Sequence, residues 1–138
     1  MSEINTEYLK RHLRTLEKSY ELLNQSEANS IEYEMYRNSL VKGFEMTIEQ
    51  SANLLRKKLT PYFASKKAVD KLTFKDLFRH ANKHSFLSNQ EIERLFKYRD
   101  NRNSTAHDYG EQFANETLQL IDSFILDTEN LIQVINND

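Results

Sequence analysis

The stretch that contains Arg102, Asn103, His107 and Tyr109 concentrates side chains capable of chemistry within eight residues. Histidine can accept or donate a proton near neutral pH, and arginine stays charged and binds phosphate through two hydrogen bonds. Metal-independent RNA cleavage needs a base for the ribose 2′-hydroxyl, an acid for the leaving oxygen and a cation for the phosphorane. One histidine supplies only one proton-transfer group, so a nuclease built on this stretch would need a symmetric dimer with two copies of it.

The same residues also have a purely structural interpretation. Arg, Asn, Ser and Thr are common near helix ends, where they cap the helix or complement its dipole, and the spacing alone favours this interpretation. Arg102 and His107 are about 140° apart on an ideal helix, so they would meet only if the helix ended or distorted between them, or across a dimer. Asn103 and His107 are four residues apart, so Asn103 could orient the imidazole on a continuous helix.

The composition predicts a single all-helical domain that spans residues 1–138. Two glycines and one proline are few turn formers for a chain in which 29% of residues are charged, which is typical of long helices with short connections. No cysteine is present, which excludes disulfides and thiolate chemistry. No apolar stretch approaches membrane-spanning length, so we expect a soluble, cytoplasmic protein without membrane contact.

Positive and negative residues are unevenly distributed along the sequence. The net charge is only −2, but residues 1–107 hold all 19 Lys and Arg against 14 acids, whereas residues 108–138 hold seven acids and no Lys or Arg. The reactive stretch lies at the border between these regions. A local positive cleft is therefore possible, although an acidic last helix is more often a solvated face.

Five segments with helical periodicity are expected to form an antiparallel up-and-down bundle. Long helices are predicted at residues 6–25, 31–59 and 111–135 from apolar residues spaced three and four apart. A short helix should begin after Thr73 and a medium one after Ser88, because each is followed by an acidic residue at the third helical position. Residues 66–71 are predicted to be a basic connector, and the last helix has an apolar face wide enough for both core and a subunit interface.

Two pairs of residues have spacings that can hold a metal ion. Glu45 and Glu49 are four apart, as are His80 and His84. Neither pair has a convergent third ligand in the sequence. We interpret the glutamates as a solvated helix face and the histidines as an exposed pair, and we predict neither a metal site nor a cofactor.

The spacing Arg-x-x-x-x-His-x-Tyr, with Asn directly after the Arg, resembles the signature of HEPN-domain proteins. The similarity is greatest to the HepT-like branch, long labelled nucleotidyltransferase substrate-binding proteins. Residues 37–49 also resemble the second-helix pattern of that branch, in which an Arg leads to an aromatic-acidic-aromatic centre followed by Glu. Here Met46 replaces the second aromatic and no Trp follows, so this part of the match is partial.

The resemblance implies a HEPN-like helical bundle, with four long or medium helices and one short helix, that forms a homodimer with the motifs at a cleft. It also implies a toxin ribonuclease that acts on RNA and is neutralised by a minimal nucleotidyltransferase through transfer of AMP to the motif tyrosine. In this scheme Arg102 would bind phosphate, His107 would be the acid-base group, Asn103 would orient it, and Tyr109 would be modified.

The sequence itself lacks the parts of a nucleotidyltransferase. That chemistry needs a Gly-Ser loop and paired aspartates for Mg²⁺, and neither Gly-Ser nor Asp-x-Asp occurs. Two hypotheses remain. The chain is a dimeric, metal-independent endoribonuclease toxin, or it is a non-catalytic subunit that presents a substrate or itself to a nucleotidyltransferase.

Overall fold

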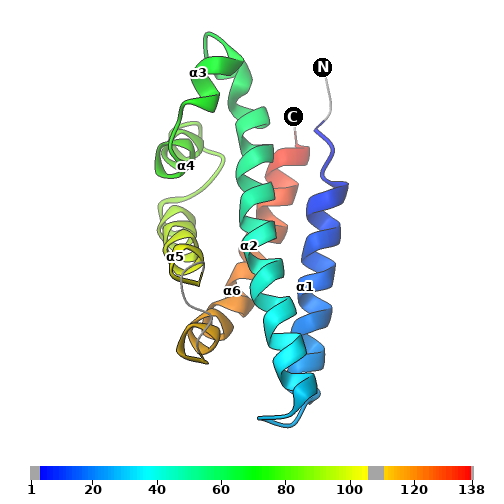
Figure 1. The fold of residues 1–138 in the computed structure, drawn as a ribbon. Helices are drawn as coiled ribbons and strands as arrows, with labels where there is room; N and C mark the ends of the chain where they lie inside the picture. Colours follow the sequence, from blue (N-terminus) through cyan, green and yellow to red (C-terminus); the bar gives the residue numbers. More distant parts are fainter. Residues whose placement is uncertain (1–3, 106–110, 138) are drawn as a thin grey trace.

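The computed structural model describes residues 4–105 and 111–137, and every regular element in this part of the chain is helical (Figure 1). The elements are α1 (Glu7–Gln25), α2 (Ile31–Leu59), the 3₁₀ turn η1 (Thr60–Tyr62), α3 (Lys66–Asp70), α4 (Phe74–Lys83), α5 (Asn89–Thr105) and α6 (Glu111–Asn136). The predicted all-α, antiparallel up-and-down bundle is therefore confirmed. None of these described helices combines the length and the apolar character that crossing a bilayer requires.

The long helix α2 is the axis around which the other helices are arranged. In Figure 1, α1 and α6 lie along one side of α2, while α3, α4 and α5 follow one another along the other side. Both ends of the described chain lie at the same end of the bundle (Figure 1). The lower part of α6 reaches across to α5, so α5 and α6 are neighbours at the opposite end (Figure 1).

Side-chain hydrogen bonds to the backbone are found at the starts of helices, at the positions where the sequence predicts that these helices begin. The Asn5 side chain accepts from the Glu7 backbone N–H at 2.9 Å before α1, and Ser30 accepts from Tyr33 N–H at 3.0 Å at the start of α2. Ser88 and Glu91 form the full reciprocal capping box of α5, with bonds of 3.2 and 3.1 Å. These caps satisfy N–H groups that would otherwise have no partner in the first helical turn.

The core is a layer of apolar side chains between α2 and the helices on both of its sides. Phe44 of α2 lies at its centre, with its ring 4.5 Å from that of Phe124 and 6.3 Å from that of Tyr98. On the other side of α2, Gly43 faces Leu16 of α1, and a Cβ at position 43 would lie 3.5 Å from Leu16 Cδ1. The largest fully buried side chains are Tyr98, Phe44, Phe78, Phe124, Leu9, Leu16, Leu23, Leu40, Leu54, Leu55, Leu59 and Leu77.

The segment predicted as a basic connector contains the short helix α3, and that prediction is wrong in this detail. Ser65 caps α3 by accepting from Ala68 N–H at 3.2 Å. The Arg56 guanidinium of α2 then donates to the carbonyls of Val69 and Leu72, at 2.8 and 2.9 Å. A helix of five residues offers only one buried apolar side chain, Val69, which is too little periodicity for detection from sequence.

Candidate functional site

The predicted motif begins in the last part of α5 and continues into the segment that precedes α6. Arg102 and Asn103 belong to α5, although only their backbone is among the described features. His107 and Tyr109 lie outside the described residues. The described residues on both sides of the motif are those of α5 and α6, and these two helices face each other.

An ion pair and a phenol connect α5 to α6 where the two helices face each other. Arg94 donates from Nε and Nη2 to the two carboxylate oxygens of Asp127, at 2.8 and 2.9 Å. The Tyr98 hydroxyl lies 2.5 Å from Asp127 Oδ2 and 2.9 Å from Ser123 Oγ. Asp127 is 8% exposed and Tyr98 is 1% exposed, so these bonds replace the water that the buried polar groups have lost.

The environment of this cluster shifts the pKa values of Tyr98 and Arg94. Burial, and then the hydrogen bond to Asp127, raises the pKa of the Tyr98 hydroxyl well above its ordinary value. The hydrogen bonds to Asp127 likewise raise the pKa of the Arg94 guanidinium. Tyr98 is therefore a neutral donor to a carboxylate at physiological pH and carries out no proton transfer of its own. The cluster is a positioning element rather than an acid-base centre.

A further bond connects the two helices next to the motif. The Asn101 side-chain amide donates to Thr117 Oγ1 at 2.8 Å, and Thr117 is fully buried. Asn101 directly precedes Arg102 in α5. The stretch of α5 from Arg94 to Asn101 is thus bonded to α6 up to the residue before the motif.

Glu45 differs from the prediction, because it does not lie on a solvated helix face. The residue is only 8% exposed, and its Oε1 atom is buried without a hydrogen-bond partner. Its Oε2 atom lies 4.0 Å from Lys42 Nζ, at the limit of an ion pair. The neighbouring Phe44 packs on Tyr98 of α5, so Glu45 lies on a stretch of α2 that is close to α5. Periodicity could not reveal this burial, since Glu45 is at the edge of the apolar seam.

His80 of α4 and His84, which directly follows this helix, are also less exposed than predicted. His84 stacks on Tyr62 with ring centroids 4.1 Å apart, and His80 packs edge-on against Phe63 at 4.9 Å. Both are half-buried. Among the described residues, no group of three or more His, Asp or Glu side chains converges in a way that would hold a metal ion.

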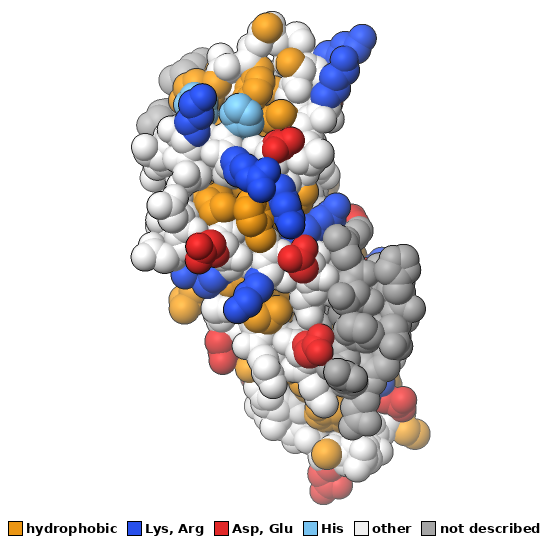
Figure 2. Space-filling view, turned by 90° about the vertical axis from the view of Figure 1, so that its left-hand side faces the viewer, with side chains coloured by type: hydrophobic (Ala, Val, Ile, Leu, Met, Phe, Trp, Pro, Cys, Tyr) orange, Lys and Arg blue, Asp and Glu red, His pale blue; other side chains and the backbone are white. Residues whose placement is uncertain are grey.

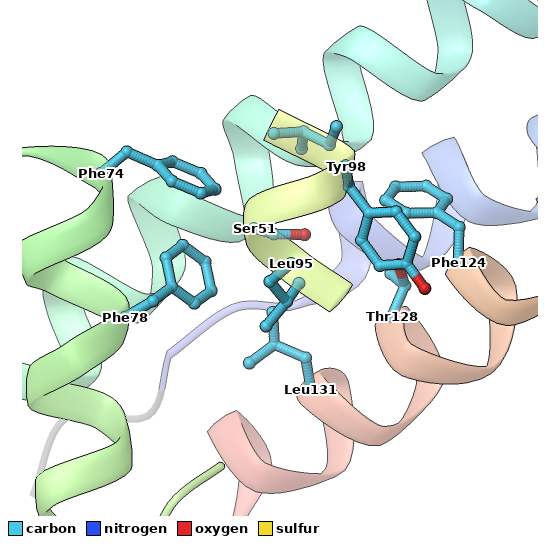
Figure 3. Close-up of a pocket in the computed structure, with 9 residues that line it drawn as sticks. Ser51, Phe74, Phe78, Leu95, Tyr98, Phe124, Thr128 and Leu131 are labelled. Atoms are coloured by element: carbon cyan, nitrogen blue, oxygen red, sulfur yellow. The ribbon is translucent and has the colours of Figure 1, made fainter. Parts of the chain in front are cut away.

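A small cavity lies between α2, α4, α5 and α6. It adjoins the hydrogen-bonded group of Arg94, Tyr98, Ser123 and Asp127, which is called the Tyr98 cluster. Figure 3 shows the rings of Phe74 and Phe78 reaching into this space from α4, with Tyr98 and Phe124 on its far side. Its volume is about 10 Å³, which is room for roughly one water molecule. Ligand pockets measure roughly 300–1,000 Å³, so this cavity is too small for a nucleotide.

The Tyr98 cluster was not predicted from the sequence, although a signal for it exists. Arg94 and Tyr98 are four residues apart on α5, and Ser123 and Asp127 are four apart on α6. Each pair places polar groups on one stripe of a helix that is otherwise apolar on its inner side. Two matching polar stripes on successive helices indicate a buried polar connection.

Comparison with known proteins adds a family and a fold. A family model described as "Nucleotidyltransferase substrate binding protein like" matches residues 5–137. One similar solved structure is a Haemophilus influenzae protein, described as having the fold of a substrate binding domain of a nucleotidyltransferase. It is 20% identical with a TM-score of 0.81, and the match covers 96% of this chain and 100% of that one.

A Thermus thermophilus protein is also 20% identical, with a TM-score of 0.74, and the match covers 94% of this chain and 99% of that one. At this identity the two structures support the fold alone. Among curated proteins, none matches the sequence significantly.

Proposed function

The chain belongs to the nucleotidyltransferase substrate binding protein-like family, and from this membership we propose that it is the helical accessory subunit of a nucleotidyltransferase. The observation that carries the proposal is the family match over residues 5–137. The sequence itself has neither the Gly-Ser loop nor the Asp-x-Asp pair of a transferase. A subunit of this kind complements the enzyme by binding it and by bringing to it the group that receives the nucleotide.

Co-expression with a minimal nucleotidyltransferase encoded beside this chain tests the proposal. We expect the two proteins to elute together in size-exclusion chromatography, with a mass by light scattering that exceeds that of either alone. A transferase from an unrelated system serves as the control and should elute separately. Separate elution of both transferases would contradict the proposal.

A second candidate function is favoured by the motif in the sequence. Arg102, Asn103, His107 and Tyr109 have the spacing of the HepT-like branch, and we propose that a homodimer brings two copies together as a metal-independent endoribonuclease. Arg102 would then bind the phosphate and His107 would transfer the proton, with Asn103 orienting the imidazole. The bonds from Arg94 and Asn101 of α5 to α6 support this candidate, because they tie the two helices together up to the residue before Arg102.

The two candidates give different outcomes when the chain is induced in cells. If the chain is a toxin, wild type arrests growth, His107→Ala does not, and the partner transferase relieves the arrest. If the chain is only an accessory subunit, wild type and His107→Ala grow alike. Incubation with the transferase and labelled ATP then tests Tyr109, since AMP transfer to this residue predicts label on wild type and none on Tyr109→Phe.

A further inference from the structure

The segment from the end of α2 to α5 carries a positive charge that the net charge of the chain conceals. Residues 56–100 contain 12 Lys and Arg against five Asp and Glu, a balance of +7. All other residues together contain seven Lys and Arg against 16 Asp and Glu, a balance of −9. The basic part corresponds to the side of the bundle on which α3, α4 and α5 lie (Figure 1).

On this side, cationic side chains of α4 lie over an aromatic ring of α5, and a cationic side chain of α5 lies over an aromatic ring of α4. Lys75 Nζ and Arg79 Cζ of α4 lie 5.5 and 5.6 Å from the ring centroid of Phe96 on α5. In the opposite direction, Arg99 Cζ of α5 lies 4.9 Å from the ring centroid of Phe74 on α4. Cations within about 6 Å of a ring centroid are attracted by the negative face of the ring. Three cationic groups therefore lie over two aromatic rings, Phe74 and Phe96, which are together called the aromatic floor.

The two rings are sheltered, while Lys75 and Arg79 above them reach the solvent and Arg99 is half-buried. Phe74 and Phe96 are half-buried and Lys75 is exposed, and the Arg79 side chain is 61% exposed. Figure 2 looks onto this side and shows Lys and Arg side chains over hydrophobic ones, with a few acidic groups beside them and histidines farther along the same face. Asp76 of α4 forms an exposed ion pair of 3.2 Å with Arg79.

A second aromatic feature continues the face along α4. Tyr62 is 55% exposed and stacks on His84 with an angle of 27° between the rings. From Lys75 to His84 the chain advances about 14 Å at the rise of an α-helix. The floor, its three cations and the Tyr62–His84 stack are together called the basic aromatic face.

We propose that the basic aromatic face binds single-stranded nucleic acid. Lys75, Arg79 and Arg99 contact backbone phosphates, and an unpaired base stacks on the open side of Tyr62. Proteins that bind single strands combine these same two parts, a positive surface that follows the backbone and aromatic rings that stack on bases. The inference rests on the proposed accessory function, because it gives the class of substrate that the subunit binds.

Two observations favour a nucleic acid over an acidic protein surface. The exposed Tyr62–His84 stack supplies a π-face, which a base uses and a carboxylate does not. The guanidinium of Arg79, positioned over a ring, presents N–H donors in the fork geometry that phosphate accepts in pairs. A polyglutamate peptide offers charge without bases, so it separates the two kinds of partner experimentally.

Fluorescence anisotropy with a labelled oligouridylate of roughly 12 nucleotides tests the proposal. The protein is used alone, with His107→Ala in every sample so that cleavage cannot consume the probe. We expect Lys75→Gln/Arg79→Gln to weaken binding by about tenfold at low salt, and to reduce the slope of log K against log salt by roughly 1.4 for two lost phosphate contacts. Tyr62→Ala should weaken binding with little change in that slope, because stacking carries no charge.

The matched control removes two exposed cations of α1, which lies on the other side of α2. Arg11→Gln/Lys18→Gln on α1 changes the net charge by the same amount as Lys75→Gln/Arg79→Gln, and should bind like the parent. Thermal unfolding followed by circular dichroism shows whether each variant is folded. Lys75→Gln alone removes no ion pair from the described part of the chain, so it retains the test if the double variant unfolds.

Several results would overturn the inference. The first is that the α1 variant weakens oligouridylate binding as much as Lys75→Gln/Arg79→Gln does. The second is that the salt slope stays unchanged in Lys75→Gln/Arg79→Gln or in folded Lys75→Gln. The others are that the probe does not bind at low salt, or that polyglutamate binds as tightly as the probe. The co-elution experiment with the transferase is independent of this one. A complex with the transferase but no binding of the oligouridylate would reject the nucleic-acid inference and leave the accessory function standing.

Discussion

Arg94 of α5 and Asp127 of α6 face each other across the helix interface and share two hydrogen bonds of 2.8 and 2.9 Å. The contact is asymmetric, because the Arg94 side chain is 42% exposed and that of Asp127 only 10%. Arg94 could therefore be hydrated without its partner, whereas Asp127 depends on protein donors. The ion pair thus serves mainly to satisfy a buried carboxylate on the inner face of α6.

We predict that Arg94→Ala destabilises the protein substantially. The change leaves Asp127 with only Tyr98 as a strong donor, so the free energy of unfolding should fall by about 2 kcal/mol. Urea unfolding followed by circular dichroism measures this. Lys66→Ala is the control, since the Lys66–Asp70 pair at 3.1 Å has side chains that are 79% and 49% exposed and should contribute less than about 0.5 kcal/mol. Equal losses in both variants would contradict the asymmetry.

A second prediction concerns Tyr98 and alkaline pH. Because burial and Asp127 raise the pKa of the folded Tyr98 above that of the unfolded chain, the protein is stabilised below the unfolded value of about 10 and loses this stability as the pH rises above it. Tyr98→Phe should lower the free energy of unfolding at pH 7 by about 1–2 kcal/mol. It should also flatten the loss of stability above about pH 10.

Unfolding midpoints measured from neutral to alkaline pH test this second prediction. Tyr8→Phe is the matched change at a surface position, since Tyr8 is 64% exposed, and it should leave the pH profile as in wild type. A Tyr98→Phe protein whose stability falls with pH as steeply as that of wild type would show that another group controls the alkaline transition.

The helices were predictable because each long one carries its own signal. Leu9, Leu13, Leu16 and Leu23 follow one stripe of α1, and all four are buried. The capping box of Ser88 and Glu91 located the start of α5 from local chemistry alone. The helix α3 escaped prediction because its five residues hold one buried apolar side chain. Its contact with Arg56 of α2 is tertiary, and such contacts leave no local pattern.

The site was predictable only in part, for a related physical reason. The motif was inferred from its spacing within one segment and from a family resemblance, and its role as the site stays a prediction. The contact of Arg94 with Asp127 spans 33 residues along the chain, and periodicity does not say which residue of α6 faces which residue of α5. Burial of Glu45 likewise depends on how helices pack around α2, so a charged residue at the edge of a seam was interpreted as solvated.

A third prediction tests the contact that holds α3. Arg56 donates to two carbonyls from one planar group, so Arg56→Ala should reduce the free energy of unfolding by about 1.5–3 kcal/mol. Arg56→Lys should restore only part of this, because a single ammonium does not match two carbonyls as the guanidinium fork does. Lys57→Ala, the exposed neighbour, controls for loss of charge near the end of α2. Amide hydrogen exchange should rise most strongly in α3, and uniform protection in Arg56→Ala would argue against a local role.

The last prediction concerns Glu45, whose Oε1 is buried without a hydrogen-bond partner. Burying a polar group without a partner is costly, so Glu45→Met, which keeps the size and the helix propensity, should raise the free energy of unfolding by about 1 kcal/mol. Residues that cost stability are often kept for function, and Glu45 belongs to the second-helix pattern that resembles the HepT-like branch. We therefore expect Glu45→Met to be more stable and also weaker in co-elution with the transferase or in growth arrest.

Lys42→Met separates the effect of the carboxylate from that of its distant neighbour. Lys42 Nζ is 4.0 Å from Glu45 Oε2 and its side chain is 70% exposed, so this change should alter stability by less than about 0.5 kcal/mol. If Lys42→Met and Glu45→Met both destabilise the protein, the two residues act as an ion pair and Glu45 is not an uncompensated cost. If Glu45→Met is stabilised with co-elution and growth arrest unchanged, the carboxylate has no functional role. Only a gain in stability coupled to a loss of function assigns a functional role to Glu45.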